Sequence, residues 1–268
     1  MRIGIGLPNT TPGPNPAVLL DWARKAEDGP FSTLGVLDRL VYDSVEPFTA
    51  LAAAAGATTR IGLATMIAIG PLRGSAMLAK QATSVNGLSG GRLTLGLAVG
   101  ARKDDYVQAG VEHRRRGAIL DDQLAHLRAE HPELPVLVGG GSGQALSRMA
   151  RYADGYAHGG GPPRAFASAA AKARAAWAEF DRPGEPLLWG QAYFGLGDPD
   201  TGSAYLRDYY AFTGPFADTI AAGNLTSARA VKDLVRGYAA EGCQELILLP
   251  TLSDPSEVDR LADALGSL

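Results

Sequence analysis

Two glycine-rich stretches stand out in this sequence as candidates for holding an anionic group. The first, Gly139-Gly140-Gly141-Ser142-Gly143, runs directly into a segment with helical spacing, Gln144–Tyr152. Glycines let the backbone approach a ligand closely, and unpaired N–H groups at the start of a helix attract an anion. The second, Gly159-Gly160-Gly161-Pro162-Pro163, is a similar glycine-rich stretch before another segment with helical spacing. We therefore expect a phosphate site here, with simple tight turns as the alternative interpretation.

Asp38 and Arg39 are a second candidate for chemistry, because they directly follow the apolar run Thr33–Leu37. An acid and a base at the end of a strand can orient a cofactor ring or a substrate carbonyl. They can also pair with each other as a salt bridge at the rim of the fold. On these residues alone, the salt bridge is the favoured interpretation.

The remaining reactive side chains give little support to other chemistries. His113, His126, His131 and His158 show none of the spacings of metal ligands, and we expect no metal site. His158 alone ends an apolar run, where a hydrogen-bonded structural histidine is the favoured interpretation. The single cysteine, Cys243, cannot form an internal disulfide, which fits a reducing cytoplasm.

The elements that must position these residues alternate between apolar runs and helical segments. The runs are mostly continuous, which is typical of strands buried on both faces. We expect strands at Ile3–Leu7, Thr33–Leu37, Ile61–Ile69, Leu93–Val99, Pro135–Val138, Gly155–His158, Leu187–Leu196 and Glu245–Leu249. We expect helices at Pro16–Glu27, Glu46–Ala57, Ala76–Leu88, Arg116–Ala129, Gln144–Tyr152, Pro163–Phe180, Ala204–Gly214, Ser227–Glu241 and Pro255–Leu265, with N-caps at Asn15, Thr226 and Asp254. The alternation predicts an α/β protein, a closed (β/α)8 TIM barrel with its site at the carboxyl ends of the strands.

Length and composition fit this architecture. The chain has 268 residues, close to the roughly 250 of an α/β barrel, and its 46% hydrophobic and 20% charged residues are an ordinary globular composition. With a net charge of −3, the chain has no excess positive charge to attract a polyanion, so we expect no nucleic-acid partner and no membrane partner. The apolar run after Met1 is too short for a signal peptide, and Arg60 interrupts the longest apolar stretch. We therefore expect a soluble, cytoplasmic protein.

Several motifs, read together, resemble the bacterial luciferase-like family of flavin- or deazaflavin-dependent oxidoreductases. They are Arg60–Thr65, the long run Leu88–Gly100 that begins Leu-Ser-Gly-Gly-Arg, and Ala150–Gly155. The resemblance covers nearly the whole chain. It implies one luciferase-like (β/α)8 domain over residues 1–268, with reduced FMN or deazaflavin F420 bound at the mouth of the barrel.

The resemblance also assigns residues to the cofactor. It implies that the phosphate is held by Gly139, Gly140, Gly141 and Ser142, at the start of the fifth helix. It places a non-prolyl cis peptide in the third strand at Met66-Ile67, against the flavin ring, and makes Thr65 and Met66 cofactor contacts. At the end of the fourth strand it implies that Val99, Gly100 and Ala101 line the same pocket.

The chain departs from the family's pattern at three places. Many members have a histidine after the acid that ends the second strand, whereas Arg39 follows Asp38 here. Ala101 is small where a tryptophan or another large residue is common. The segment around 129–135 is short where relatives carry a longer excursion, so we expect a more open pocket.

The function implied by the resemblance is an oxidoreductase reaction. The leading interpretation is a monooxygenase in which reduced FMN, supplied by a separate flavin reductase, and O2 oxygenate a small organic substrate. Asp38 and Arg39 would then orient the ring or stabilise a developing oxyanion. One alternative is hydride transfer with F420, and another is a flavin-binding protein that catalyses little. The family also commonly forms homodimers through its second and third helices, where the small residues of Ala50–Ala57 permit close packing.

Overall fold

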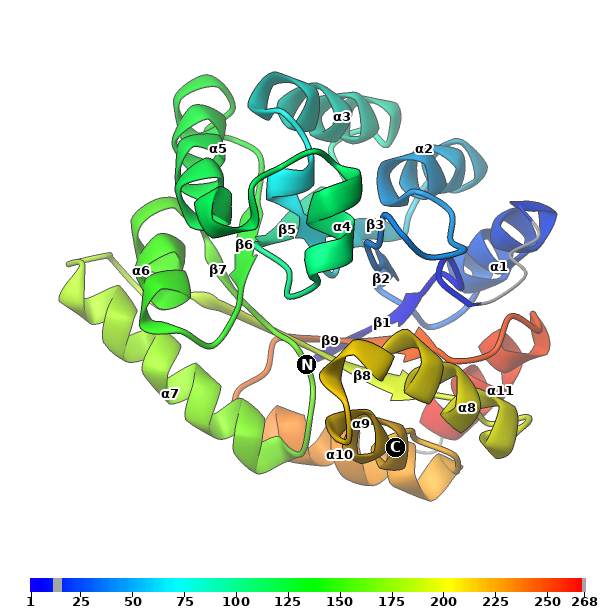
Figure 1. Cartoon of the computed structure of the whole chain (residues 1–268). Coiled ribbons are helices and arrows are strands. Elements are labelled where there is room, and N and C mark those ends of the chain that lie inside the picture. The colour runs from blue at the N-terminus through cyan, green and yellow to red at the C-terminus, as the bar shows by residue number, and fades with distance from the viewer. Residues whose placement is uncertain (12–15, 267–268) are drawn as a thin grey trace.

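The computed structural model describes residues 1–11 and 16–266, so the expected cap at Asn15 lies outside the described residues. The strands are β1 (Arg2–Gly6), β2 (Thr33–Val36), β3 (Gly62–Thr65), β4 (Ala68–Ile69), β5 (Leu93–Ala98), β6 (Val136–Gly139), β7 (Gly155–His158), β8 (Leu187–Phe194) and β9 (Glu245–Pro250). They pair in the order β3-β2-β1-β9-β8-β7-β6-β5-β4, and β3 also pairs with β5. Every one of these pairings is parallel. The sheet is therefore closed, and the predicted (β/α)8 barrel is confirmed (Figure 1).

Helices surround this barrel (Figure 1). They are α1 (Pro16–Asp28), α2 (Pro47–Ala57), α3 (Ser75–Leu88), α4 (Lys103–Gln108), α5 (Arg116–Glu130), α6 (Gly143–Tyr152), α7 (Pro163–Glu179), α8 (Pro199–Tyr209), α9 (Phe216–Ala222), α10 (Ala228–Ala240) and α11 (Ser256–Leu265), with 3-10 turns η1 (Gly70–Leu72), η2 (His113–Arg115) and η3 (Ala211–Thr213). The expected helix Ala204–Gly214 is wrong at both ends, because Asp198 caps α8 through Thr201 N (3.1 Å) and the helix ends at Tyr209. The cap of α10 is Ser227, not Thr226, because the Ser227 hydroxyl accepts from Ala230 N.

The third barrel strand is broken, where a continuous strand Ile61–Ile69 was expected. β3 ends at Thr65, β4 begins at Ala68, and the Met66–Ile67 peptide between them is cis, as the family resemblance implied. Thr65 ties this point to β5, because its hydroxyl donates to Gly96 O (2.7 Å) and accepts from Gly96 N (2.9 Å). A Cβ on Gly96 would lie 2.2 Å from Thr65 O, so the close approach of the two strands requires glycine there.

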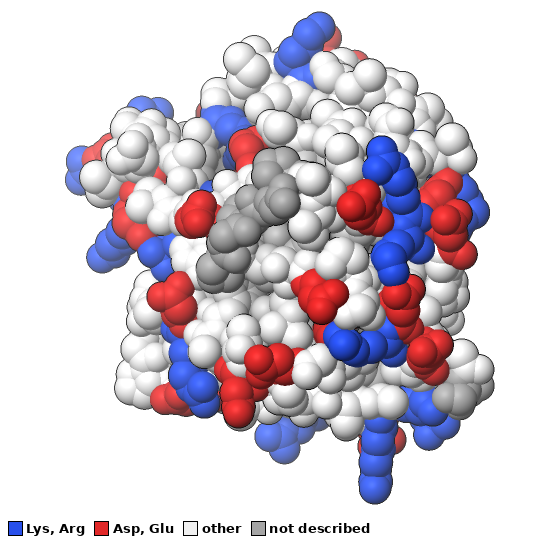
Figure 2. All heavy atoms as spheres, turned by 90° about the vertical axis from the view of Figure 1, so that its right-hand side faces the viewer, with Lys and Arg blue, Asp and Glu red and all other residues white. Residues whose placement is uncertain are grey.

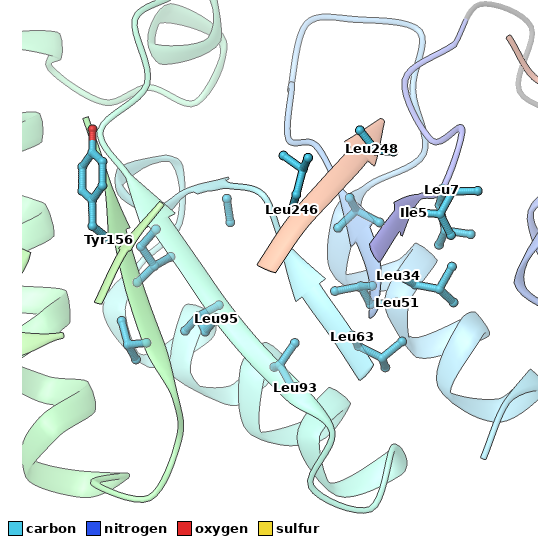
Figure 3. Packing of buried hydrophobic residues seen from close by; sticks show 14 of the residues in the cluster. Ile5, Leu7, Leu34, Leu51, Leu63, Leu93, Leu95, Tyr156, Leu246 and Leu248 are labelled. Carbon is cyan, nitrogen blue, oxygen red and sulfur yellow. The ribbon is translucent and has the colours of Figure 1, made fainter. Parts of the chain in front are cut away.

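The hydrophobic core has two layers. The larger cluster lies between the strands and the helices; Figure 3 shows part of it, including Leu51 of α2 with Leu34 and Leu63 of the strands. A smaller cluster contains Met66 and Ile247 together with residues of α8. Burial on both faces explains why the strands read as continuous apolar runs.

The surface carries both signs of charge. Figure 2 shows a face on which Lys and Arg are interspersed with Asp and Glu. Within residues 1–11 and 16–266, no helix is both long enough and apolar enough to cross a membrane.

Glu27 of α1 fastens the turn that leads into β3. Its carboxylate accepts hydrogen bonds from Thr59 N (2.8 Å), Arg60 N (2.7 Å) and Ile61 N (2.8 Å). Burial raises its pKa, but these backbone donors and the Thr59 hydroxyl together lower it to about 2. Because this is below the unfolded-state value, the stabilisation is complete above about pH 4.5 and is lost as the pH falls towards 2.

We therefore expect Glu27→Gln to lower the free energy of unfolding by about 1 kcal/mol at neutral pH, since one of the two acceptor oxygens is lost at a largely accessible site. The deficit should shrink towards zero near pH 2, as measured by urea unfolding. Glu130→Gln, on an exposed part of α5, is the matched control and should show no deficit. A deficit that is the same at both pH values would contradict this role for the Glu27 carboxylate.

Candidate functional site

A cavity of about 500 Å³ opens at the carboxyl ends of the barrel strands. Its lining comes from the ends of β2, β4, β5, β6 and β7, from the cis peptide, from Gln191 of β8 and from the α8–η3 segment. This volume is in the usual range of small-molecule sites. A shallower depression of about 430 Å³ lies at the other end of the barrel, around Arg2 and Arg60, and none of the predicted site residues borders it.

The first glycine loop borders this cavity through Gly139, Gly140 and Gly141. Gly140 has a φ of +115°, a conformation that favours glycine, and a Cβ on Gly141 would meet open space. Ser142 is the N-cap of α6, and its hydroxyl accepts from Ala145 N (3.2 Å). The start of α6 thus presents backbone N–H groups beside an open space, as an anion site requires.

The strand ends beside this loop contribute a mostly apolar wall. Met66 and Gly100 line the cavity, as does Ile67 beyond the cis peptide. Thr65 is fully buried and bonded to Gly96, and the Val99 carbonyl accepts from the Tyr106 hydroxyl. Thr65, Val99 and Ser142 are not among the residues that line the cavity, so their predicted contact with a cofactor stays a prediction.

Asp38 lines the cavity but does not pair with Arg39. Its side chain is 3% exposed and accepts from Arg73 Nη1 (2.6 Å), and it also accepts from Ile69 N (2.8 Å). Burial raises the pKa of Asp38, against the lowering effect of Arg73. The favoured salt bridge between Asp38 and Arg39 is wrong, because Asp38 pairs with Arg73 and Arg39 lies against Asp105 instead.

Arg39 is held in a buried position of its own. Its guanidinium lies 5.0 Å from the ring centroids of both Tyr42 and Tyr209, and its Nε lies 3.3 Å from Asp105 Oδ2. Nη1 donates to the carbonyl of Tyr209 (3.2 Å). Asp105 in turn accepts from the backbone of Leu40 (3.1 Å) and the next residue, which fixes the loop after β2. The chain therefore places a rigid, desolvated cation at the edge of the cavity.

Sequence reasoning missed the aromatic part of the lining. Tyr209, Tyr210 and Phe212 come from the end of α8 and from η3, and Tyr156 comes from β7. The aromatic density of the stretch 205–216 was a signal that could have found three of them.

His158 also lines the cavity. Among the described residues, its Nε2 is buried with no hydrogen-bond partner, and burial lowers the pKa of the ring. The ring packs on Phe166, with the two centroids 5.7 Å apart. The expected structural histidine thus borders the site, with one nitrogen that the chain does not satisfy.

The segment between α5 and β6 lies at the opposite end of the barrel from the cavity. α5 ends at Glu130 and β6 begins at Val136, so residues 131–135 lead into the amino end of a strand. The expectation that this short segment opens the pocket is therefore wrong. The cavity is bordered instead by Arg102, at the start of α4, and by Phe212 of η3.

A closed parallel barrel with a cavity at the carboxyl ends of its strands has the layout of a TIM-barrel enzyme, in which the site lies at that end. More specifically, the chain belongs to the luciferase-like monooxygenase family, whose sequence profile matches residues 1–131 and 124–242. In Mycobacterium tuberculosis (strain H37Rv), the uncharacterized protein Rv0940c is 31% identical over 187 residues, which cover 53% of this chain and 65% of that protein. This chain therefore matches just under two thirds of the length of that relative. The uncharacterized protein Rv0953c of the same strain is 30% identical over 139 residues, 42% of this chain and 49% of that protein.

Solved structures share the fold along nearly the whole chain. An F420-dependent secondary alcohol dehydrogenase, in complex with an F420-acetone adduct, superposes with a TM-score of 0.83 at 15% identity, covering 99% of this chain and 98% of that one. The monooxygenase RslO1 from Streptomyces bottropensis has a TM-score of 0.76 at 15% identity, with 100% and 99% covered. The FMN complex of the oxygenating constituent of 3,6-diketocamphane monooxygenase, from Pseudomonas putida, has a TM-score of 0.72 at 13% identity, with 98% and 96% covered. At these identities the likeness shows the fold alone. Among these structures, one is described with F420 and another with FMN.

Proposed function

We propose that this chain is a flavin-dependent monooxygenase that uses reduced FMN and O2 to oxygenate a small organic substrate. The observation that carries the proposal is one cavity bordered by the glycine loop before α6, the Met66–Ile67 cis peptide and the buried cation Arg39. Membership of the luciferase-like monooxygenase family supports it. Asp38 and Arg39 are the two residues to which this proposal gives a role in the reaction. Arg39 provides a positive charge, and Asp38 positions the groups around it.

The residues around the cavity fit such a cofactor. A phosphate fits at the start of α6, where Gly140 and Gly141 leave the backbone accessible and no carboxylate of the described residues lines the loop. The flat ring fits against the apolar wall of Met66, Ile67 and Gly100. When bound, the reduced flavin supplies the electrons with which O2 is activated.

The chain's own groups provide binding, orientation and electrostatics. Asp38 holds the backbone beyond the cis peptide through Ile69 N and fixes Arg73. Arg39 provides a cation close to the reacting centre, where a positive charge stabilises a developing oxyanion. Tyr209 and Phe212 cover the mouth with aromatic surface, which helps to exclude water from the reaction.

The test is a titration of the purified protein with reduced FMN and, separately, with reduced F420, followed by absorbance without O2. We expect FMN to bind, and O2 added to the complex to be consumed with formation of an oxygenated product. Binding of F420 with no affinity for FMN would instead establish the hydride-transfer alternative. Rapid reoxidation with no product from any oxidisable substrate would favour a flavin-binding protein that catalyses little.

We further propose that the chain works as a homodimer and receives reduced flavin from a separate reductase in the cytoplasm. The α2 and α3 helices pack beside each other, and Met77 and Leu88 of α3 are exposed (60% and 66%). Exposed apolar side chains on this helix pair support a contact between copies through α2 and α3.

A further inference from the structure

A hydrogen-bonded pair of tyrosines lies at one side of the cavity and has no part in the function proposed above. The hydroxyl of Tyr193, on β8, lies 2.7 Å from the hydroxyl of Tyr210, which directly follows α8. Of the two, only Tyr210 is among the described residues that line the cavity. Two hydroxyl groups have two protons, and one bond between them uses only one.

The direction of this bond follows from burial. If Tyr210 donated, the Tyr193 proton would have no acceptor among the described residues, and a buried unpaired donor is costly. If Tyr193 donates, the Tyr210 proton is left free at the side of the cavity. Burial raises the pKa of Tyr210, but the bond from Tyr193 and the charge of Arg39 both lower it, which agrees with this order. Tyr210 is therefore the hydroxyl with a proton to offer.

Arg39 supplies a second unused donor at the same side. The side chain is 4% exposed and lies against the Tyr209 ring, which in turn packs on Tyr210 with centroids 5.0 Å apart. In the described part of the chain, Nη2 of Arg39 is buried without an acceptor. A guanidinium fixed between two aromatic rings has little freedom to find another partner.

Two acceptors beside Arg39 are already taken: the carbonyl of Tyr209 accepts from Nη1 (3.2 Å), and Asp105 forms an ion pair with Nε (3.3 Å). Asp38, the carboxylate in the lining, receives hydrogen bonds from Arg73 and Ile69 N. Arg102 also lines the cavity, paired with Asp104. This side of the cavity therefore offers donors to a ligand, and a ligand that satisfies them must bring its own oxygen acceptor.

We propose that Arg39 and Tyr210 form an oxyanion clamp that binds the anionic oxygen of an organic acid, with Tyr209 and Phe212 against its apolar body. The inference rests on the proposed function in treating the cavity as the substrate site. It narrows the substrate class to compounds that carry a carboxylate or another anionic oxygen on an apolar, ring-sized body.

The test uses benzoate and benzyl alcohol as probes, titrated by calorimetry into the purified protein without flavin. We expect benzoate to bind saturably and benzyl alcohol to bind at least tenfold more weakly, since it lacks the charge. Tyr210→Phe should weaken benzoate binding about fivefold to tenfold, and Arg39→Met about tenfold to a hundredfold. Tyr205→Phe is the matched control, because its buried hydroxyl is bonded to Thr10 (2.8 Å), and it should leave the affinity unchanged.

The direction of the tyrosine bond has its own test. Tyr193→Phe should leave benzoate affinity within about twofold, since the Tyr210 proton stays free. A loss with Tyr193→Phe but not with Tyr210→Phe would overturn the inference, as would equal binding of the two probes or no saturable benzoate binding. FMN binding without benzoate binding would rule out the oxyanion clamp and leave the proposed function standing. Benzoate binding without affinity for FMN or F420 would rule out the proposed function and leave the oxyanion clamp standing.

Discussion

Replacing Gly141 with aspartate should abolish binding of a phosphate-bearing cofactor while the barrel stays folded. Gly141 lines the cavity one residue before the N-cap of α6, and its Cβ would enter open space, so the new side chain fits. Its carboxylate would face the phosphate across a short distance. Two unit charges about 4 Å apart near a protein surface repel by about 4 kcal/mol, or roughly a thousandfold in affinity. The measurement is the titration with reduced FMN, together with circular dichroism to verify folding.

The matched control is Gly74→Asp, which adds the same charge to another helix start. Gly74 is the N-cap of α3, a Cβ there would also meet open space, and aspartate is a favoured N-cap residue. We expect full cofactor binding by this variant. An unchanged affinity in Gly141→Asp would remove the loop before α6 from the cofactor site.

Replacing Asp38 with alanine should be the most destabilising of these substitutions. Arg73 is 12% exposed, and without Asp38 its remaining carboxylate partner is Glu46 at 2.8 Å. The N–H of Ile69 also loses its acceptor. Breaking a buried ion pair costs about 3 kcal/mol at the lower end of the usual range. For a chain of this size that lowers the thermal midpoint by roughly 6 to 12 °C, measured by calorimetry.

Asp21→Ala is the control for this prediction. Asp21 pairs with Arg24 on α1, but both side chains are more than half exposed (65% and 58%). Such pairs contribute little, and we expect a change within about 0.5 kcal/mol. If Asp38→Ala matched this control, Arg73 would not depend on Asp38, and the positioning role of Asp38 would be lost with it.

The barrel was predictable because its signals are local. Each strand is a short, continuous apolar run, and the glycine loop and Ser142 are adjacent in the sequence, so their meeting at the start of α6 needed no knowledge of distant contacts. The break at Met66-Ile67 has no such signal, since the run Ile61–Ile69 is apolar except for Thr65. Only the family resemblance placed it.

The partners of the charged residues were not predictable for the opposite reason. Asp38 meets Arg73, 35 residues away, and Arg39 meets Asp105, which lies in α4. Because Asp38 and Arg39 are adjacent in the sequence, a salt bridge between them was the favoured interpretation. Only closure of the barrel brings these distant segments together, and neither composition nor periodicity encodes which cation faces which carboxylate. The meeting of Tyr156 with Tyr209, Tyr210 and Phe212 around the cavity depends on closure of the barrel in the same way.

Three of the aromatic lining residues, Tyr209, Tyr210 and Phe212, come from a single excursion of the chain between β8 and α10. The ends of the excursion are fastened to each other, because Gly195 N donates to Leu225 O (3.1 Å) and Leu225 N donates to Tyr193 O (2.9 Å). In the described structure, the chain between them, which includes Tyr209, Tyr210 and Phe212, contributes no strand to the barrel. This stretch can therefore lengthen, shorten or be exchanged in evolution without disturbing the loop before α6. Under the proposed function, the stretch beside the substrate and the loop that would hold the cofactor can therefore change independently in one small barrel.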